Sequence, residues 1–520
     1  MEQKEPKDQP ADQRTCDVLV VGGGINGAGI ARDAAGRGLS VILCEKDDLA
    51  SHTSSASTKL IHGGLRYLEY YEFRLVRKAL IEREVLLRSA PHIMRPLRFV
   101  MPHEDGLRPA WMIRAGMLLY DLLAKRELLP SSRGANLKKH AAGKPLAERF
   151  RRGFIYSDGW VDDARLVVLN AIGAREKGAQ ILTRTACLSL EQQGKHWLAR
   201  LKDRSGRQFE VKARAVVNAS GPWAVKFLQH AAHHPADRNL RLIKGSHIVV
   251  KKLFEHQHAY IFQHPDGRIV FAIPYERDFT LIGTTDIDYH GDLDQVAIDE
   301  KEVGYLCELV SRYFRQPVKP ADVVWTYSGV RPLVEDASAS ASAVTRDYRF
   351  ELDRDGAPML TVFGGKITTF RKLAEEALDL LAPLLGNTQG AWTANACLPG
   401  GDIYGPKPQN RSVREFERFI ASMQRRYAWL PSDVVKRYAH AYGSRIHVLL
   451  DGRGAIGDMG EEVAPGLYGA ELEYLVLHEW ARDAADILWR RTKLGLHLPA
   501  DTAQRVAHWL ARHPLRAADE

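Results

Sequence analysis

Hydrophobic residues near the start of the chain stand in short runs that glycines separate. The apolar run at residues 18–21 predicts a buried parallel strand, and residues 30–37 predict a helix that ends near Gly36 and Gly38. A second strand is expected at residues 41–43. Strand, helix and strand within about 30 residues form a βαβ unit, so we expect the chain to begin with an α/β domain.

The same kind of pattern returns twice farther along. Asp162 or Asp163 is expected to start a capped helix that Gly178 stops, with a strand following at Ile181. The stretch ARAVVNASGPW predicts a strand that runs into a turn at Gly221. Later, MLTVFGGKITTFRKLAEEALDLL predicts a strand, a glycine turn and a helix. This last segment returns to the order of strand, glycine turn and helix, although the sequence shows no internal repeat.

Between these segments the pattern changes. SHIVV, GRIVFAIPY and DFTLIGTTD are short, β-branched and close together, and a tight ERD connection joins the last two, which fits an antiparallel sheet. Residues 90–153 are basic and less regular in pattern. Beyond the glycine- and proline-rich LPGGDIYGPKP, residues 410–513 are expected to be mostly helical.

Composition adds a bias toward anionic partners. The 520 residues carry a net charge of +9, with an isoelectric point near 9.1, which favours phosphorylated metabolites, nucleic acid or acidic lipid. Five scattered cysteines without a CxxC pair argue for reduced thiols in a cytosolic compartment and against a zinc site. No stretch approaches the roughly 18 uncharged apolar residues of a membrane-spanning helix, so we expect a soluble or membrane-surface protein.

A nucleotide-binding pattern lies in VVGGGINGAG. Gly22, Gly24 and Gly27 supply G-x-G-x-x-G between a strand and a helix, where the backbone can approach a pyrophosphate and the helix N-terminus faces it. Glu45 ends the second strand and is placed to accept hydrogen bonds from ribose hydroxyls, which disfavours NADP. The hydroxyl-rich TSSAST that follows favours FAD over NAD, because a longer cofactor needs donors beyond the pyrophosphate.

Six motifs then follow one another in a specific order. They are DVLVVGGGINGAGIARDAAGRGLSV, SSASTKLIHGGLRYLE, RLIKGSHIVV, IGTTD, TYSGVRPL and VFGGKITTFRKLAE. In this order they resemble the aerobic FAD-dependent glycerol-3-phosphate dehydrogenases of bacteria, within the glycine/D-amino-acid-oxidase-like flavoproteins. The resemblance runs from Asp17 to the C-terminal helices and covers nearly the whole chain.

The resemblance implies an α/β fold in which a Rossmann-like FAD domain is assembled from separated segments. A substrate cap on an antiparallel sheet and a mostly helical C-terminal domain complete it. We expect a disordered arm at 1–15, the FAD domain at 16–90, 154–240 and 340–387, the cap at 91–153 and 241–339, and the C-terminal domain at 388–520.

The implied reaction is the oxidation of sn-glycerol 3-phosphate to dihydroxyacetone phosphate by hydride transfer to FAD. The family further implies that electrons pass to ubiquinone and that the protein is peripheral, on the cytoplasmic face of the inner membrane, where the surface is anionic. We also expect a homodimer. No nucleic acid and no metal ion is expected as a partner.

The resemblance also implies which residues surround the substrate. A small dianion needs fixed cations, and Arg66, Arg331 and Lys366 offer them. We assign Arg66 and Lys366 to the phosphate, and Arg331 and His247 to the alcohol, where a base must take the hydroxyl proton. Tyr67 is expected beside the substrate. The resemblance leaves open which residue is the base.

The residues expected to bind FAD lie in the same motifs and at their turns. They are Gly22, Gly24, Asn26, Gly27, Glu45, Ser54, Ser55, Lys59, His62, Gly221, Gly364 and Thr368.

Two other functions stay open. A flavin oxidase of an amino acid or hydroxy acid, with oxygen as acceptor, would share this fold, although several cations suit a phosphate better than a carboxylate. A flavoprotein that binds RNA would need a basic stripe with interleaved aromatic residues. In residues 72–114 the basic residues alternate with apolar ones in helix-like order instead.

Two charged segments remain to be interpreted, and the first allows two interpretations. In RPAWMIRAGMLLYDLLAKREL, Arg114, Asp121 and Lys125 share a helical face, apart from Trp111, Met117, Leu118 and Leu122. Further arginines are nearby, at Arg95, Arg98, Arg108 and Arg126. The segment is either an interfacial helix attracted to anionic lipid or an amphipathic helix packed on a core. The charges of WRRTKLG are expected on a solvated helix face.

Overall fold

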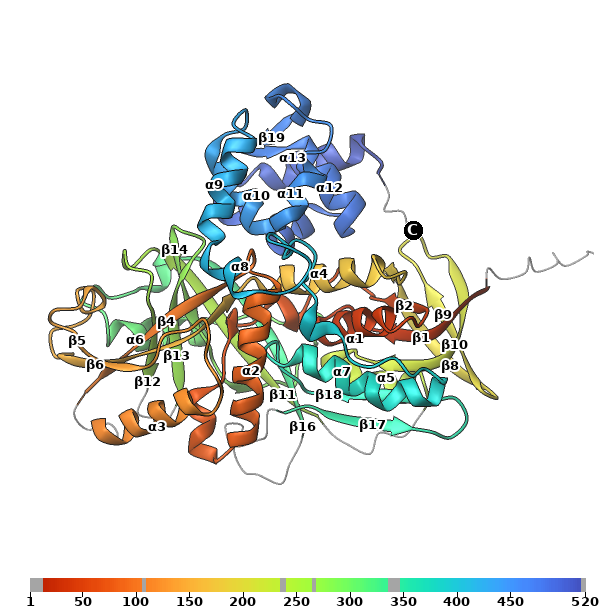
Figure 1. The fold of residues 1–520 in the computed structure, drawn as a ribbon, viewed down its shortest axis with the longest axis horizontal. Helices are drawn as coiled ribbons and strands as arrows, with labels where there is room; N and C mark the ends of the chain where they lie inside the picture. Colours follow the sequence, from red (N-terminus) through yellow and green to blue (C-terminus); the bar gives the residue numbers. More distant parts are fainter. Residues whose placement is uncertain (1–12, 105–108, 234–239, 264–267, 335–346, 516–520) are drawn as a thin grey trace, which may run out of the picture.

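The computed structural model describes residues 13–104, 109–233, 240–263, 268–334 and 347–515. Two β-sheets lie side by side, and the C-terminal helices pack above them in the view of Figure 1. The α/β fold class with a sheet-based first domain and a helical C-terminal region is therefore confirmed. Strand β1 begins at Gln13, inside the segment expected to be a disordered arm, because its first residues pair with β10.

The first sheet is built on parallel strands. Its order is β17 (Arg349–Asp353), β18 (Met359–Phe363), β10 (Gln208–Asn218), β1 (Gln13–Val21), β2 (Val41–Cys44) and β7 (Gln180–Leu182), with β8 (Ala186–Gln193) and β9 (His196–Lys202) added on β10. Helices α1 (Ile25–Gly36), α4 (Asp163–Arg175) and α7 (Phe370–Leu381) pack on one face. Alternate residues of β1 serve the two faces: Val18 and Val20 pack under these helices, and Leu19 faces the β8–β9 side.

Helix α1 starts five residues earlier than the sequence pattern predicts. Gly24 is its N-cap, so the helix begins directly at the glycine turn. Small residues make this possible, because a Cβ on Gly27 would overlap the carbonyl oxygen of Gly22 and one on Gly29 would stand 2.8 Å from the ring of Phe370. The amino end of α1 thus lies against the turn that a dinucleotide would occupy.

The second sheet is largely antiparallel. Its order is β15 (Ile287–Asp288), β11 (Leu240–Lys251), β14 (Phe279–Gly283), β13 (Ile269–Tyr275), β12 (Ala259–Gln263), β4 (Met94–His103), β6 (Arg152–Val161) and β3 (Leu60–Ile61), while β16 (Val323–Val334) pairs with β11 and β5 (Arg133–Asn136) with β6. Helices α2 (Phe73–Ser89), α3 (Ala110–Leu122) and α6 (Glu300–Ser311) complete this part of the chain. The short α5 (Ala224–His230) packs instead on the first sheet, near β18.

The impression that residues 90–153 are irregular is wrong. Strand β4 lies in the middle of the second sheet, antiparallel to β6 and parallel to β12. Its basic residues hide the pattern because they have structural partners: Arg98 donates to Ser157 Oγ at 2.7 Å, and Arg95 lies over the ring of Trp160. These two basic residues of β4 thus contact β6.

The C-terminal region has its own core. Its helices are α8 (Asn410–Arg414), α9 (Phe416–Arg426), α10 (Ser432–Tyr442), α11 (Ile446–Leu449), α12 (Gly469–Glu479) and α13 (Thr502–Arg512), with a small sheet of β19 (Glu462–Ala464) and β20 (Leu467–Tyr468). The prediction of a mostly helical region is confirmed.

The prediction of a solvated face for WRRTKLG is wrong. The side chain of Arg491 is fully buried and donates two hydrogen bonds of 2.8 Å to the carboxylate of Asp48, just beyond β2. Lys493 donates to Asp162 at 3.2 Å, and Trp489 stacks on Trp325 of β16. These charges therefore join the C-terminal domain to both sheets.

We predict that Asp48→Ala lowers the free energy of unfolding by about 3–5 kcal/mol, because it leaves the buried Arg491 guanidinium without its carboxylate. Thermal denaturation of the holoprotein measures the change. Asp294→Ala is the matched control, since Asp294 pairs with Lys46 at a half-exposed site, and we expect little effect. Equal melting temperatures for both variants would contradict a stabilising role for the buried pair.

Candidate functional site

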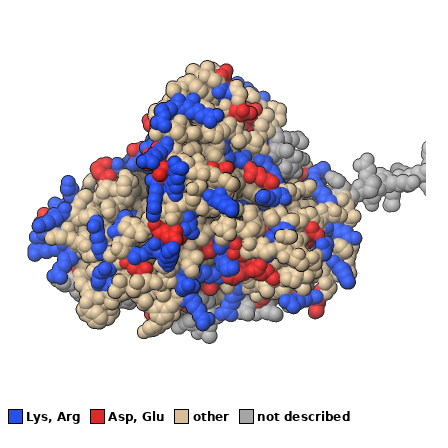
Figure 2. Space-filling view, in the orientation of Figure 1, with Lys and Arg blue, Asp and Glu red and all other residues tan. Residues whose placement is uncertain are grey.

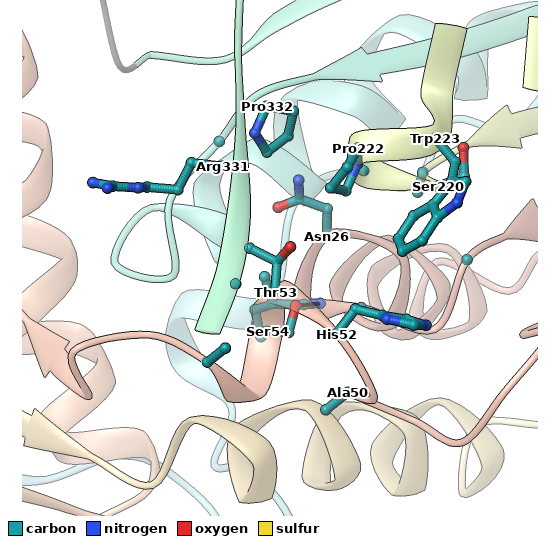
Figure 3. A pocket seen from close by; sticks show the side chains of 18 of the residues that line it. Asn26, Ala50, His52, Thr53, Ser54, Ser220, Pro222, Trp223, Arg331 and Pro332 are labelled. Carbon is teal, nitrogen blue, oxygen red and sulfur yellow. Dashed lines mark hydrogen bonds between the residues drawn. The ribbon is translucent and has the colours of Figure 1, made fainter. Parts of the chain in front are cut away.

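A cavity of about 650 Å³ lies where the two sheets meet. Its wall combines the turn after β1, residues 50–54, 56–58 and 219–223 and the glycine turn after β18 with side chains of β11 and β16. In Figure 3, Asn26, Thr53 and Ser54 lie between Arg331 on one side and Trp223 on the other. The cavity therefore spans the nucleotide-binding turn and the expected substrate residues.

The nucleotide end is formed by the first glycine turn. Gly22 has a φ of +113°, and a Cβ there would stand 2.5 Å from the carbonyl oxygen of Ala219. The Glu45 carboxylate accepts from the backbone N–H of Gly23 at 2.6 Å and of Asp47 at 2.9 Å. Burial raises the pKa of Glu45, and these two donors oppose the shift. Glu45 thus fixes the turn while it lines the cavity.

The residues beyond this turn fit FAD. Ser54 Oγ accepts from the N–H of Ile25 at 3.0 Å, so the segment after Glu45 folds over the start of α1. Asn26 donates to Gly364 O at 3.1 Å, and its buried Oδ1 has no hydrogen-bond partner among the described residues. Gly365, at a φ of +102°, keeps this wall clear of side chains. Backbone turns, hydroxyls and one orphaned amide oxygen suit a long, polar cofactor.

Most of the residues expected to bind FAD line the cavity. These are Gly22, Gly24, Asn26, Glu45, Ser54, His62, Gly221, Gly364 and Thr368. Gly27, Ser55 and Lys59 are not in its wall. Gly27 faces the Gly22 carbonyl, Ser55 donates to the His52 carbonyl at 3.2 Å, and Lys59 points into the protein toward Asp163.

Four of the five expected substrate residues line the other end of the cavity: Tyr67, His247, Arg331 and Lys366. Lys366 Nζ stands 3.9 Å from the centroid of the Tyr67 ring. Arg331 forms an ion pair with Asp286 and donates to Thr285 O at 3.2 Å. Two cations, an aromatic ring and an imidazole thus share this end.

His247 is buried between two strands. Its partner in β16 is Tyr327, whose ring stacks on the imidazole at 4.7 Å, and its partner in β14 is Gly283. Thr58 Oγ1 lies 3.0 Å from its Nε2. Burial, reinforced by Lys59 and Arg331, holds the pKa of His247 well below its ordinary value. The imidazole is therefore neutral near pH 7 and able to accept a proton.

Arg66 lies outside the cavity wall. It belongs to the 3₁₀ helix η2 (Leu65–Tyr70), and its guanidinium donates to Tyr70 OH at 3.4 Å. Its neighbour Tyr67 does line the cavity.

Several residues around the site were not anticipated from the sequence. Thr58, Gly283, Asp286 and Tyr327 all lie inside the quoted motifs, so a signal existed, but their contacts with His247 and Arg331 depend on strand register. Trp223 follows the expected Gly221 turn and packs edge-on against His52 at 4.6 Å.

Comparisons with known proteins agree with this geometry. Residues 17–371 match the family described as FAD dependent oxidoreductase, and residues 391–514 match the C-terminal domain of alpha-glycerophosphate oxidase. A solved structure, the glycerol-3-phosphate dehydrogenase from Bacillus halodurans complexed with FAD, is 28% identical with a TM-score of 0.76 and covers 96% of this chain and 90% of its own.

Similar chains include two dehydrogenases of glycerol 3-phosphate and one of another phosphate ester. Glycerol-3-phosphate dehydrogenase of Pseudomonas aeruginosa is 55% identical, over 96% of both chains. The aerobic enzyme of Escherichia coli is 50% identical, and D-erythritol 1-phosphate dehydrogenase of Brucella abortus 49%, each over 96% of this chain and 98% of the relative. The predicted cofactor, FAD, is confirmed by the family. The chain belongs to the FAD-dependent oxidoreductases, in the glycerol-3-phosphate dehydrogenase family.

Proposed function

We propose that the protein oxidises sn-glycerol 3-phosphate to dihydroxyacetone phosphate. The observation that carries this proposal is the pair of cations, Arg331 and Lys366, beside a neutral His247 at one end of the FAD-binding cavity. Lys366 offers a cation to the phosphate, and Arg331 lies near the alcohol. The alcohol also requires a proton acceptor, which His247 offers. The names of the similar enzymes support the same substrate.

The residues divide the work as follows. Lys366 and Arg66 hold the phosphate, for which the Arg66 side chain turns from Tyr70 toward the cavity. Arg331, oriented by Asp286, lies near the alcohol. His247 accepts the hydroxyl proton, because burial and the neighbouring cations keep its ring neutral. Bound FAD supplies the two-electron acceptor for the hydride from C2.

Two observations favour specific alternatives. The D-erythritol 1-phosphate dehydrogenase of Brucella abortus is nearly as similar as the glycerol-3-phosphate enzymes, so a longer polyol phosphate is a second candidate substrate. The C-terminal match carries the name of an oxidase, so oxygen is a second candidate acceptor. Hydrogen peroxide formation at the turnover rate would favour the oxidase.

We expect sn-glycerol 3-phosphate to bleach the flavin absorbance near 450 nm rapidly under anaerobic conditions, whereas glycerol and glycerate leave it oxidised. Lys366→Met should raise the half-saturating substrate concentration about 10–100-fold, because one charge-assisted contact with the phosphate is lost. Lys372→Met, which changes a half-exposed lysine on α7, is the matched control. Bleaching by D-erythritol 1-phosphate or by an amino acid alone would overturn the proposed substrate.

We expect Gly283→Ala to slow flavin reduction about 100-fold, because the new methyl group would overlap the His247 ring and displace it from the alcohol. Stopped-flow reduction with bound FAD measures the rate. The control is Gly304→Ala on α6, where no heavy atom lies within 4 Å of the added Cβ. An unchanged rate in Gly283→Ala would argue against His247 as the base.

We further propose that the protein is peripheral, on the cytoplasmic face of the inner membrane, and that it passes electrons from the flavin to ubiquinone. Within the described residues, no helix combines the length and apolarity required to cross a bilayer. Helix α3 has instead an exposed apolar face, formed by Trp111, Met112, Leu118, Leu119 and Leu122, and η2, which contacts α3, adds the exposed rings of Tyr70 and Tyr71. In Figure 2 the surface over α3, at the lower left, carries few charges.

The inward side of α3 carries apolar and polar residues together, because Met117 and Tyr120 are buried in the core beside Asp121. Arg114 donates to Ser132 Oγ at 2.7 Å, and the buried Asp121 accepts from the N–H of Ser132 at 2.8 Å. Trp111 is 70% exposed and Leu122 72%. The helix thus packs on the core with one side and turns a second apolar face to solvent, and this second face supports an interfacial role. Arg108 lies outside the described residues, and the expected homodimer stays a prediction.

We expect the triple variant Trp111→Ser, Leu118→Ser, Leu122→Ser to lose at least about 10-fold of its affinity for vesicles of phosphatidylethanolamine and phosphatidylglycerol, because three large apolar contacts disappear. Dye-linked activity should be retained. Val448→Ser with Ile456→Ser, in the C-terminal domain, controls for exposed apolar residues elsewhere. Undiminished vesicle binding would exclude α3 as the docking surface. Binding of the wild-type protein to vesicles of neutral lipid shows how much of the affinity comes from electrostatic attraction.

A further inference from the structure

Lys59 is a buried lysine behind the wall of the cavity. It is 1% exposed, and its Nζ donates to Asp163 Oδ1 at 2.7 Å and to Ser55 O at 3.1 Å. Its backbone φ of +59° is one that residues other than glycine seldom adopt. A buried charge and an uncommon backbone conformation both cost stability. Their coincidence at one residue beside the site points to a role that the proposed reaction has not yet used.

The Lys59–Asp163 pair reaches His247 through Tyr327. Lys59 Nζ lies 4.9 Å from the centroid of the Tyr327 ring, and the same ring stacks on the imidazole. Asp163 also accepts from Ser57 Oγ at 2.8 Å, while Ser57 O accepts from Tyr327 OH at 2.9 Å. The pair therefore fixes both the ring beneath His247 and the segment whose Thr58 touches Nε2.

We propose that Lys59, held by Asp163, is a positioning residue that acts on His247 through the ring of Tyr327. Its positive charge opposes a second positive charge on the imidazole and so favours the neutral ring. This proposal rests on the proposed function, in which His247 accepts the hydroxyl proton of the substrate.

The charges around His247 come from several elements. Lys59 stands on the segment before β3, Arg331 on β16 with its partner Asp286, and Asp163 at the start of α4; Tyr327 is the titratable ring in contact. After burial, Lys59 and then Arg331 lower the pKa of His247. Burial also lowers the pKa of Lys59 itself, and Asp163 opposes that shift. The ion pair thus keeps Lys59 charged.

The C-terminal domain contributes to this network. Asp162, next to Asp163, accepts from Lys493 at 3.2 Å, and Lys493 belongs to the WRRTKLG segment. The network therefore continues from the active-site histidine into the last domain of the chain.

The test is the double variant Lys59→Met, Asp163→Asn, which removes the pair together and leaves no unpaired buried charge. The pH profile of kcat/KM for sn-glycerol 3-phosphate is measured with the holoenzyme and a soluble dye. Without the cation the imidazole protonates at higher pH, so we expect the acid limb to move to higher pH. On that limb kcat/KM should fall about 10-fold relative to wild type for each pH unit of the move. Ionisation of the substrate phosphate affects both enzymes equally, so it does not change the ratio of their kcat/KM values.

A conservative variant and a second readout keep the result decisive. Lys59→Arg keeps the positive charge and should show the wild-type pH profile. If the double variant binds no FAD, Lys59→Gln is used in its place, because its amide can still donate to Asp163. Carbon-13 NMR of labelled histidines, with His247 assigned through His247→Gln, follows the imidazole without substrate. We expect the imidazolium signal to appear at higher pH in the Lys59 variant than in wild type, and identical titrations would overturn the proposal.

The two readouts separate the two proposals. A moved His247 titration with an unmoved kinetic limb would support Lys59 as the positioning residue and reject His247 as the base. A wild-type flavin that stays oxidised with the substrate would reject the proposed function, and the NMR titration would still decide the role of Lys59.

Discussion

The register of β11 against its two neighbours is the constraint on which the site depends. Side chains alternate along a strand, so a slip of one residue would turn His247 to the opposite face of the sheet. The preceding residue, Ser246, prevents this slip: its buried hydroxyl donates to Glu302 at 2.8 Å and lies 2.8 Å from Ser328 Oγ. Lys244, on the same face, pairs with Glu302 at 2.7 Å. A polar anchor on one face thus sets the position of the histidine on the other.

Local patterns were enough to predict the nucleotide end of the cavity. A glycine turn between a strand and a helix, followed by an acid at Glu45, is defined within a few tens of residues, and the structure builds that turn from the same residues. His247 and Arg331 came from motifs of the resemblance. Their surroundings could not be predicted, because Gly283 and Tyr327 meet His247 through strands far apart in sequence.

Charge was the least predictable property of the chain. Basic residues between 90 and 153, and again in WRRTKLG, suggested irregular or solvated segments, yet Arg98 and Arg491 have buried partners. Nothing in sequence spacing indicates that Asp48 and Arg491 meet. The placement of apolar residues was also undecided by pattern alone, and α3 exposes an apolar face. The short helix η2 connects this face to the cavity, because its Tyr67 lines the cavity and its Tyr70 is exposed.

The buried pair of Asp48 and Arg491 also bears on how the chain is made. Asp48 leaves the ribosome 443 residues before Arg491 does. Until then, the segment beyond Glu45 lacks the guanidinium that fixes it, and Asp162 lacks Lys493. The segment beyond Glu45 therefore gains these partners only after translation of WRRTKLG, and a chain that stops before residue 490 lacks all of them.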